Sequence, residues 1–274
     1  MLLPNIAITS YLGSSKEVRK VRLECHLRQR KKIKHLFPDL KILSICSDYT
    51  SKEKKFLDRY DCLFLKKRTH KYVKHNLIFE ELYKSKHREE AVLLLDDDVF
   101  PLKEWELPLC STSFFVNNIL KRPYVLPAAC MYFSCAHLFF DAYNKARIRK
   151  EGSIVTAPLQ VCGWAMWVRS DLGVVYTDET CIEPETGLVL DDMPFRCKCY
   201  AEGKRVLKHL GAYFDSYQWN TKRVSSFFDS EDSWRQTIKV HTEYLLKKHP
   251  NHFMKVRGKV RFKKNHSKGF DIQP

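Results

Sequence analysis

The chain has 274 residues, of which 44% are hydrophobic, 13% are aromatic and only 9 are glycine. This composition excludes a disordered or fibrous chain and suits one large globular domain. The formal net charge is +16, and so large a positive excess favours polyanionic partners such as nucleic acid, an anionic membrane surface or phosphate-rich substrates.

The cysteines and the apolar tracts bear on the compartment. There are 10 cysteines, but the first thirteen residues lack the basic leader of a secretory signal, and the cysteine spacings match no zinc-binding pattern. We therefore expect reduced, mostly buried thiols in a cytoplasmic protein. The longest apolar tract, residues 124–140, contains Pro127, Ser134 and His137 and is too short for a comfortable membrane span. We expect no transmembrane segment.

Strands and helices alternate in the first hundred residues. Hydrophobic runs bounded by turn residues predict strands over 5–12, 40–49, 61–67 and 91–95. Between them, helices are predicted over 16–35, with Ser14 or Ser15 as N-cap, over 51–60 and over 71–85. Such alternation predicts an α/β domain with a mixed, mainly parallel sheet flanked by helices.

The second half of the chain is less regular. An aromatic-rich stretch over 123–153 has no clear pattern, and a strand is predicted within 158–172. A helix follows, with Asp191 or Asp192 as N-cap, Pro194 in its first turn and Gly203 at its end. After Glu243 there is no acidic residue until Asp271, which suits either a disordered tail or an edge strand on a basic surface. We expect a catalytic domain over 1–240, with halves 1–100 and 101–240, and a basic extension over 241–274.

Three adjacent aspartates, Asp96, Asp97 and Asp98, directly follow the apolar strand over 91–95. Neighbouring carboxylates repel one another, and a hard divalent cation, which prefers oxygen ligands, is the simplest group to offset them. In the alternative interpretation one aspartate caps a turn and the others are solvated. In α/β sheets of this kind ligands bind beyond the carboxyl ends of the strands, where the triplet lies.

Four segments, in this order, resemble the GT-A class of nucleotide-sugar glycosyltransferases, especially inverting enzymes of the family-2 type. "KYVKHNLIFEEL" is similar to the helix that carries an asparagine, here Asn76, before the metal-binding motif. "LLLDDDVF" is similar to the strand and aspartate-x-aspartate motif itself. "GWAMWVRSDL" is similar to the strand with a glycine and an arginine beside the acceptor site, and "LDDMPFRCKCYAEGKR" to the acidic pair, arginine-bearing helix and closing glycine.

The resemblance implies a GT-A-like fold and a nucleotide-sugar donor, UDP-linked, held with Mn²⁺ or Mg²⁺. Asp98 and Asp96 would be metal ligands, and His209 or Asp215 a further ligand, although either could be structural. Asp97 would point to the opposite side, because neighbouring strand positions alternate. The residues expected to bind the nucleotide-sugar are Tyr11, Asp48, Lys74, Asn76, Asp96 and Asp97. Among these, Tyr11 could instead pack in the core, Asp48 could be a turn residue, and Lys74, with Lys71 and His75, could be a solvated helix face.

The resemblance also implies catalytic and acceptor-binding residues. Asp192, with Asp191 as its neighbour, would be the base that takes the proton of the attacking hydroxyl, because two adjacent acids can raise one another's pKa. The alternative for this pair is a helix cap without catalysis. Acceptor contacts are expected from Gly163, Trp164, Arg169 and Arg196, although tryptophans on an apolar strand often pack in the core.

The acceptor is inferred from charge. A small or neutral acceptor does not need a net charge of +16, so we expect double-stranded DNA, with a precedent in bacteriophage enzymes that glycosylate hydroxymethylcytosine or a sugar already on it. In that case the enzyme would work in the host cytoplasm. The residues expected to contact the DNA backbone are Arg28, Arg30, Lys31, Lys32, Lys34, Arg257 and Arg261. The alternatives are a transferase with a glycan or lipid acceptor at an anionic membrane, a non-catalytic nucleic-acid-binding protein, and a nucleotidyl transferase.

Overall fold

The structure is a computed structural model. It describes residues 3–13, 15–85, 90–101, 129–135, 154–156, 165–181, 192–216, 239–240, 243–244, 246–247, 250, 253–256 and 259–262. Side chains are described for most of these residues, and the backbone alone for the rest.

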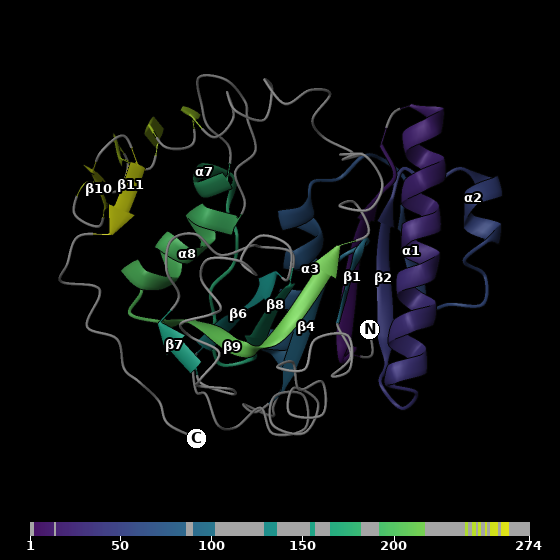
Figure 1. Ribbon diagram of the computed structural model, residues 1–274, viewed down its shortest axis with the longest axis horizontal. Helices are drawn as coiled ribbons and strands as arrows, with labels where there is room; N and C mark the ends of the chain where they lie inside the picture. Colours follow the sequence, from purple (N-terminus) through teal and green to yellow (C-terminus); the bar gives the residue numbers. More distant parts are fainter. Residues whose placement is uncertain are drawn as a thin grey trace.

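Strands and helices alternate along the first hundred residues, as the hydrophobic pattern predicts (Figure 1). The elements are β1 (Ile6–Tyr11), α1 (Lys16–Leu36), β2 (Ile42–Ser47), α2 (Ser51–Lys55), β3 (Cys62–Leu65), α3 (Lys71–Lys84), β4 (Ala91–Asp96) and β5 (Val99–Pro101). Helix α1 begins after Ser15, whose side chain accepts a hydrogen bond from the Val18 amide. Helix α2 is shorter than predicted, because the chain turns at Phe56.

The second half adds further strands to the same sheet. Its described elements are β6 (Ala129–Cys135), β7 (Ile154–Thr156), β8 (Ala165–Arg169), α7 (Asp178–Cys181), α8 (Asp192–Ala201), β9 (Arg205–Ser216), β10 (Phe253–Val256) and β11 (Lys259–Phe262). Helix α8 has Pro194 in its first turn, and Gly203, in a left-handed conformation with φ of 67°, lies just beyond its end. Strands β10 and β11 pair with each other as a separate two-stranded sheet within the expected basic extension.

The main sheet is mixed and mainly parallel, which confirms the predicted fold class. Its strand order is β3-β2-β1-β4-β8-β6-β9-β5, with β7 also paired to β9. Strands β1, β2, β3, β4, β6 and β9 run in one direction, whereas β5, β7 and β8 run in the other. Because the sheet includes strands from both halves of the chain, those halves share one core.

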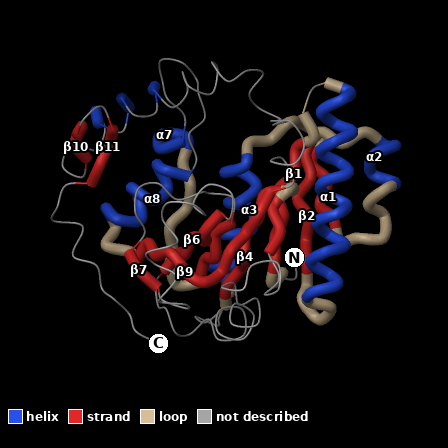
Figure 2. The backbone as a smooth tube through the Cα atoms, in the orientation of Figure 1, coloured by secondary structure: helices blue, strands red, loops and turns tan. Residues whose placement is uncertain are grey.

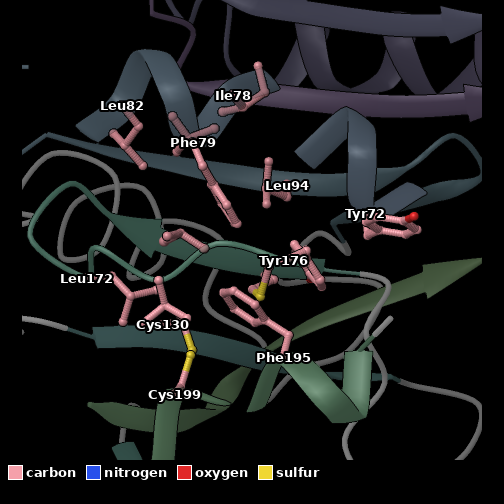
Figure 3. Close-up of a cluster of buried hydrophobic side chains, with 14 of the residues drawn as sticks. Tyr72, Ile78, Phe79, Leu82, Leu94, Cys130, Leu172, Tyr176, Phe195 and Cys199 are labelled. Atoms are coloured by element: carbon pink, nitrogen blue, oxygen red, sulfur yellow. The ribbon is translucent and has the colours of Figure 1, made fainter. Parts of the chain in front are cut away.

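Helices cover both faces of this sheet (Figure 2). Alternate residues of each strand point to opposite faces, so that Ile6, Ile8, Leu93 and Leu95 pack against Ile33 of α1. The opposite face carries a second cluster, formed by strand residues with side chains of α3, α8 and the segment 172–181, and Figure 3 shows part of it. Burial of these two clusters fixes the sheet between α1 on one side and α3 and α8 on the other.

Strand β1 lies where the strand order reverses. From β1 the chain proceeds outward to β2 and then β3, and it returns to place β4 on the other side of β1. The carboxyl ends of β1 and β4 therefore lie side by side at a topological switch point, the place where open α/β sheets bind their ligands. Strand β4 ends at Asp96, so the aspartate triplet lies at this switch point.

Two observations concern the expected compartment. The cysteines whose side chains the structure describes are free thiols: Cys25, Cys46, Cys62, Cys130, Cys181, Cys197 and Cys199. Among the described helices, none combines the length and apolarity needed to cross a membrane.

Candidate active site at the carboxyl ends of β1 and β4

The aspartate triplet divides into two buried carboxylates, Asp97 and Asp98, and one partly exposed carboxylate, Asp96. In the register of β1 and β4, Thr9 pairs with Asp96, which brings the next residue, Ser10, beside Asp97. The Ser10 hydroxyl donates a hydrogen bond of 2.5 Å to Asp97 Oδ2. Because Asp97 is fully buried, this bond joins the carboxyl ends of the two strands inside the protein.

Asp97 is neutralised by an arginine of α1. The Arg22 guanidinium is buried, and its Nη2 donates to Asp97 Oδ1 in a close ion pair. Burial raises the pKa of Asp97, and Asp98 adds to that effect, whereas Arg22 opposes it. Asp97 was expected to bind the nucleotide-sugar, but a fully buried carboxylate with two internal partners supports the site from within, so this expectation is corrected.

Asp96 and Asp98 face a different environment. The Asp96 side chain is partly exposed, and Lys71 Nζ lies 3.3 Å from its Oδ1. Asp98 is buried, with its Oδ2 3.6 Å from Arg22 Nη1. Helices α1 and α3 thus each send one cation from opposite faces of the sheet to the carboxylates at the end of β4. These cations offset part of the repulsion within the triplet.

Lys74 is buried beside the carboxyl end of β1. Its Nζ donates a hydrogen bond of 2.6 Å to the Ser10 carbonyl, and the residue is 2% exposed. Burial lowers the pKa of Lys74 to about 8, against the opposing attraction of Asp97. Lys74 was expected to contact the nucleotide-sugar directly. Its amine instead ties α3 to the end of β1, and this expectation is also corrected.

The donor set at the end of β4 fits a hard divalent cation. Asp96 and Asp98 supply carboxylate oxygens two residues apart, which Mn²⁺ and Mg²⁺ accept as ligands. No group of three potential ligands from histidine, cysteine, aspartate and glutamate is present among the residues whose side chains the structure describes. A further ligand would therefore come from a residue outside that set, or from a bound phosphate or water.

Strand pairing distinguishes the two candidates for a further ligand. Asp215 lies opposite Phe100 in the antiparallel pair of β5 and β9, only two residues beyond Asp98. His209 lies six residues earlier on β9, opposite Phe133 and Ile154. The side chains of Asp215 and His209 are not described, so their backbone positions alone favour Asp215.

Tyr11 and Asp48 lie at the same edge of the sheet as the triplet. Tyr11 ends β1, is 5% exposed and has the Arg68 guanidinium 4.9 Å from the centre of its ring. Asp48 follows β2 directly, and its side chain is 49% exposed. Parallel neighbours β1 and β2 place these two residues on adjacent strand ends. Both remain candidates for contact with a nucleoside.

Asn76 has a different role from the expected one. Its Nδ2 donates to the Tyr176 carbonyl at 2.9 Å, and its Oδ1 accepts from the Tyr176 amide at 3.0 Å. Both ends of the amide are therefore committed to the backbone of the segment that follows β8. The prediction that Asn76 binds the nucleotide-sugar is corrected, because this side chain fastens α3 to that segment.

Arg169 is the acceptor candidate that the pairing of β8 with β4 places in the sheet. Because β8 runs antiparallel to β4, Ala165 pairs with Leu95, whereas Arg169 pairs with Ala91 at the opposite end of the strand. Arg169 is buried with its Nε 2.9 Å from Asp171 Oδ1. The prediction for Arg169 is therefore wrong: it lies at the edge of the sheet remote from the triplet.

The remaining acceptor and catalytic candidates are only partly described. Gly163 and Trp164 lie outside the described residues, immediately before Ala165 in the sequence, and Asp191 lies outside them as well. Helix α8 begins at Asp192, whose side chain is not described. Arg196 is buried, with its guanidinium 5.2 Å from the centre of the Tyr132 ring. Asp191, Asp192, Gly163 and Trp164 stay predictions.

The residues expected to contact DNA are only partly on the surface. Arg28, Lys31 and Lys34 are exposed on α1, and Lys32 lies with its Nζ 4.2 Å from the centre of the Phe100 ring. Arg30 is wrongly predicted, because it is 4% exposed and its Nη1 donates to the Ile42 carbonyl. Arg257 lies outside the described residues, and Arg261 is in β11 with its side chain undescribed.

Sequence reasoning missed three residues that organise the crevice: Ser10, Arg19 and Arg22. The spacing of α1 contained the signal, since Arg22, Cys25, His26, Gln29 and Ile33 recur every three or four residues on its buried face. An arginine in such a series requires an acidic partner, and the triplet was the evident candidate. The strongly basic character of α1 concealed this inward-facing set.

Comparisons with known proteins give distant structural similarity only. No family model and no curated protein matches the chain. A protein assigned as a nucleotide-diphospho-sugar transferase from Desulfovibrio desulfuricans G20 is 11% identical over 87% of this chain and 96% of its own, with a TM-score of 0.43. TarS residues 1–349 from S. aureus is 9% identical over 88% and 69%, with a TM-score of 0.45. GalNAc-T7 with UDP, GalNAc and Mn²⁺ is 10% identical over 90% and 51%, also with 0.45.

Proposed function

We propose that the chain is a metal-dependent glycosyltransferase that moves a sugar from a nucleotide-sugar donor to a hydroxyl group. One observation carries this proposal: Asp96 and Asp98 lie at the switch point between β1 and β4, within reach of Lys71 and Arg22. Open α/β sheets bind their ligands at such a point. Carboxylates and cations together suit one that brings both a metal ion and phosphate groups.

Each element at this edge has a part in binding the donor. Asp96 and Asp98 would hold Mn²⁺ or Mg²⁺, with Asp215 as a further ligand. When bound, the metal would act as a Lewis acid that offsets the charge growing on the leaving diphosphate. Tyr11 and Asp48 would face the nucleoside of a UDP-linked donor. Asp97, Arg22 and Lys74 support the crevice from inside the protein.

The transfer step needs a base on the acceptor side. The acceptor oxygen forms a bond to the anomeric carbon, the bond from that carbon to the β-phosphate oxygen breaks, and the hydroxyl proton passes to a carboxylate. We assign that carboxylate to Asp192 at the start of α8, with Asp191 beside it. Attack on the face opposite the leaving group would invert the configuration of the anomeric carbon.

For the acceptor we propose duplex DNA that carries hydroxymethylcytosine, or a sugar already attached to it. The support is the net charge of +16 and the exposed Arg28, Lys31 and Lys34 on α1. A hydroxymethyl group on cytosine lies in the major groove, so the enzyme would either reach into the groove or flip the base.

A transfer assay tests donor, acceptor and reaction class together. The donors would be UDP-, GDP- and CMP-linked sugars with MnCl₂, and the acceptors hydroxymethylcytosine DNA, its glucosylated form and unmodified DNA. We expect a gain of one sugar mass on a modified nucleoside, detected by nucleoside mass spectrometry. Donor hydrolysis without any gain on DNA would keep the transferase and move the acceptor to a glycan or lipid. A nucleotide-sized gain would indicate nucleotidyl transfer instead.

Two substitutions separate donor binding from transfer. Asp98→Asn should abolish manganese-dependent UDP binding, because the metal loses a charged ligand. Asp192→Asn should keep that binding and lose transfer. Asp58→Asn, at an exposed position after α2, is the matched control and should change neither. Wild-type UDP affinity in Asp98→Asn would remove Asp98 from the metal site.

A further inference from the structure

Two turns at the carboxyl edge of the sheet contain a residue in the left-handed region. Gly13, after β1, has φ of 94°, and Asp48, after β2, has φ of 61°. Asp48 is the one residue other than glycine with positive φ in the described part of the chain. Left-handed backbone is unfavourable for a residue with a Cβ atom, and such strain gathers at functional sites.

A single side chain of α1 holds both turns. Arg19 Nη1 donates to the Gly13 carbonyl at 2.8 Å, and its Nη2 donates to the Asp48 carbonyl at 2.7 Å. The same Nη1 lies 3.7 Å from Asp48 Oδ2. The guanidinium therefore donates a hydrogen bond to the carbonyl oxygen of each left-handed residue, and it also lies near the carboxylate of Asp48.

Arg19 is itself held in place by α2. Its Nε donates to Glu53 Oε1 at 2.9 Å, and Nη2 donates to Oε2 at 2.6 Å, which is the fork geometry of a strong arginine–carboxylate pair. Glu53 also completes a capping box with Thr50, whose amide donates to Oε2 at 2.8 Å. Helix α2 and the turns after β1 and β2 thus form one connected unit.

The carboxylate of Asp48 forms an ion pair with Arg19, at 3.7 Å, but the protein does not enclose it. Glycine would adopt the same turn without strain, yet this position carries an acid with a half-exposed side chain beside the end of β1. An exposed carboxylate held in this way can accept hydrogen bonds from a ligand. We propose that Arg19 is a positioning residue that holds Asp48 to select the base of a uridine diphosphate group.

This inference rests on the proposed function and specifies its donor. A carboxylate accepts a hydrogen bond from the ring N–H of uracil, whereas cytosine presents a lone pair at that ring position and would be repelled. The ratio of UDP to CDP affinity therefore reports where the Asp48 carboxylate lies. A role of Arg19 in stability alone would leave that ratio unchanged.

The test is calorimetric titration of the full chain with UDP and with CDP in the presence of MnCl₂. We expect the wild type to prefer UDP. Arg19→Gln should lower that preference on the order of tenfold, the contribution of one hydrogen bond to a charged group. Lys20→Gln, at the exposed neighbouring position on α1, is the control and should keep the wild-type preference.

The Asp48→Gly variant gives a second, independent test of the inference. It should lose the preference for UDP while melting at no lower temperature than the wild type, because glycine relieves the left-handed strain. Adding Arg19→Gln to Asp48→Gly should change the preference no further, since both substitutions remove the same interaction.

Each other outcome has a definite meaning. A wild-type preference in Arg19→Gln overturns the role of Arg19 and leaves the proposed function intact. If Arg19→Gln does not fold, Arg19→Lys decides: its single ammonium cannot reach both carbonyls and Glu53, so a wild-type preference in that variant also overturns the inference. A wild type that binds neither UDP nor CDP overturns the proposed function, and this inference with it.

Discussion

His26 is a neutral imidazole enclosed between α1 and β2. It is fully buried, with Nδ1 3.1 Å from the Tyr49 hydroxyl and Nε2 2.9 Å from Ser44 Oγ. Burial, together with the nearby cations Arg30, Arg22 and Lys74, lowers the pKa of His26 to about 3. His75 on α3 is also buried, and burial holds its pKa well below the ordinary value.

Protonation of His26 should therefore favour the unfolded chain as the pH falls below the ordinary histidine pKa of about 6.5. Between the ordinary histidine pKa of about 6.5 and the folded value of about 3, the unfolded chain binds a proton at His26 that the folded chain does not. The free energy of unfolding should fall as pH falls through that window, by about 2 kcal/mol at pH 5 for His26. Urea unfolding at a series of pH values measures this dependence.

Replacing His26 tests whether this residue causes the loss of stability in acid. His26→Gln should be less stable than the wild type at pH 7.5 and lose less stability on acidification, because it no longer binds that proton. His35→Gln, on the exposed face of the same helix, should keep the wild-type dependence. Parallel pH curves for the wild type and His26→Gln would contradict the assignment.

Single residues also show how far sequence could predict the site. The position of Asp96 and Asp98 followed from an apolar run ending in acids, a local pattern. Strand alternation predicted only that Asp97 points to the side opposite Asp96 and Asp98, and not that it is buried. The partners of Asp97 could not be predicted in the same way, because Ser10 and Arg22 are 87 and 75 residues away in sequence and meet it only through the order of the strands.

At the scale of elements, the segment after β8 joins α3 to α8. Tyr176 is stacked between Phe79 of α3 and Phe195 of α8, with ring centres 5.9 Å and 4.3 Å away (Figure 3). Asn76 holds the backbone of Tyr176 through two hydrogen bonds. Since Phe195 is one helical turn beyond Asp192, this stack connects α3 to the start of the helix that carries the proposed base.

Replacing Asn76 should weaken the connection between α3 and the segment that contains Tyr176. In Asn76→Ala the amide and carbonyl of Tyr176 lose their partners in a partly buried place, at a cost of about 1–3 kcal/mol in the free energy of unfolding. Urea unfolding measures the cost, and Glu80→Ala, at an exposed position of α3, is the control. A loss no greater than that of the control would show that water replaces both hydrogen bonds.

Strand β8 shows why the prediction for Arg169 was wrong. A strand was expected within 158–172, and β8 at Ala165–Arg169 confirms it. The local pattern does not specify strand direction, however, which depends on how the chain reaches the sheet. Because β8 runs antiparallel to β4, Arg169 lies beside Ala91 rather than near Asp96. The sequence pattern could predict that these residues form a strand. It could not predict which strand they pair with or in which direction they run, because both depend on distant segments.

At the scale of the whole molecule, its positive charge serves two different purposes. Part of it is internal, since the buried Arg22 and Lys74 meet Asp97 and the end of β1. Another part is external, on the exposed side of α1, where Arg28, Lys31 and Lys34 lie. Only the external part is available to a polyanionic acceptor, so a surface inferred from composition overstates what α1 offers, as Arg30 illustrates.

If duplex DNA is the acceptor, the exposed side of α1 should contribute to its binding in a salt-dependent way. Each lysine–phosphate contact adds about 0.9 to the slope of log affinity against log salt concentration. Replacing Lys31 and Lys34 together by glutamine should therefore lower that slope by about 2. Fluorescence anisotropy with a labelled duplex at several salt concentrations measures it.

The matched control replaces the same charge elsewhere. Lys41→Gln combined with Lys84→Gln removes two exposed positive charges that lie away from this side of α1, at the start of β2 and the end of α3. An equal change of slope in both double variants would mean that DNA responds to net charge and not to this face. No DNA binding, together with binding to phosphatidylglycerol vesicles that the Lys31 and Lys34 variant loses, would place α1 against a membrane. The lysines of α1 would then hold the enzyme beside a glycan or lipid acceptor, and the donor crevice at β1 and β4 would keep its role.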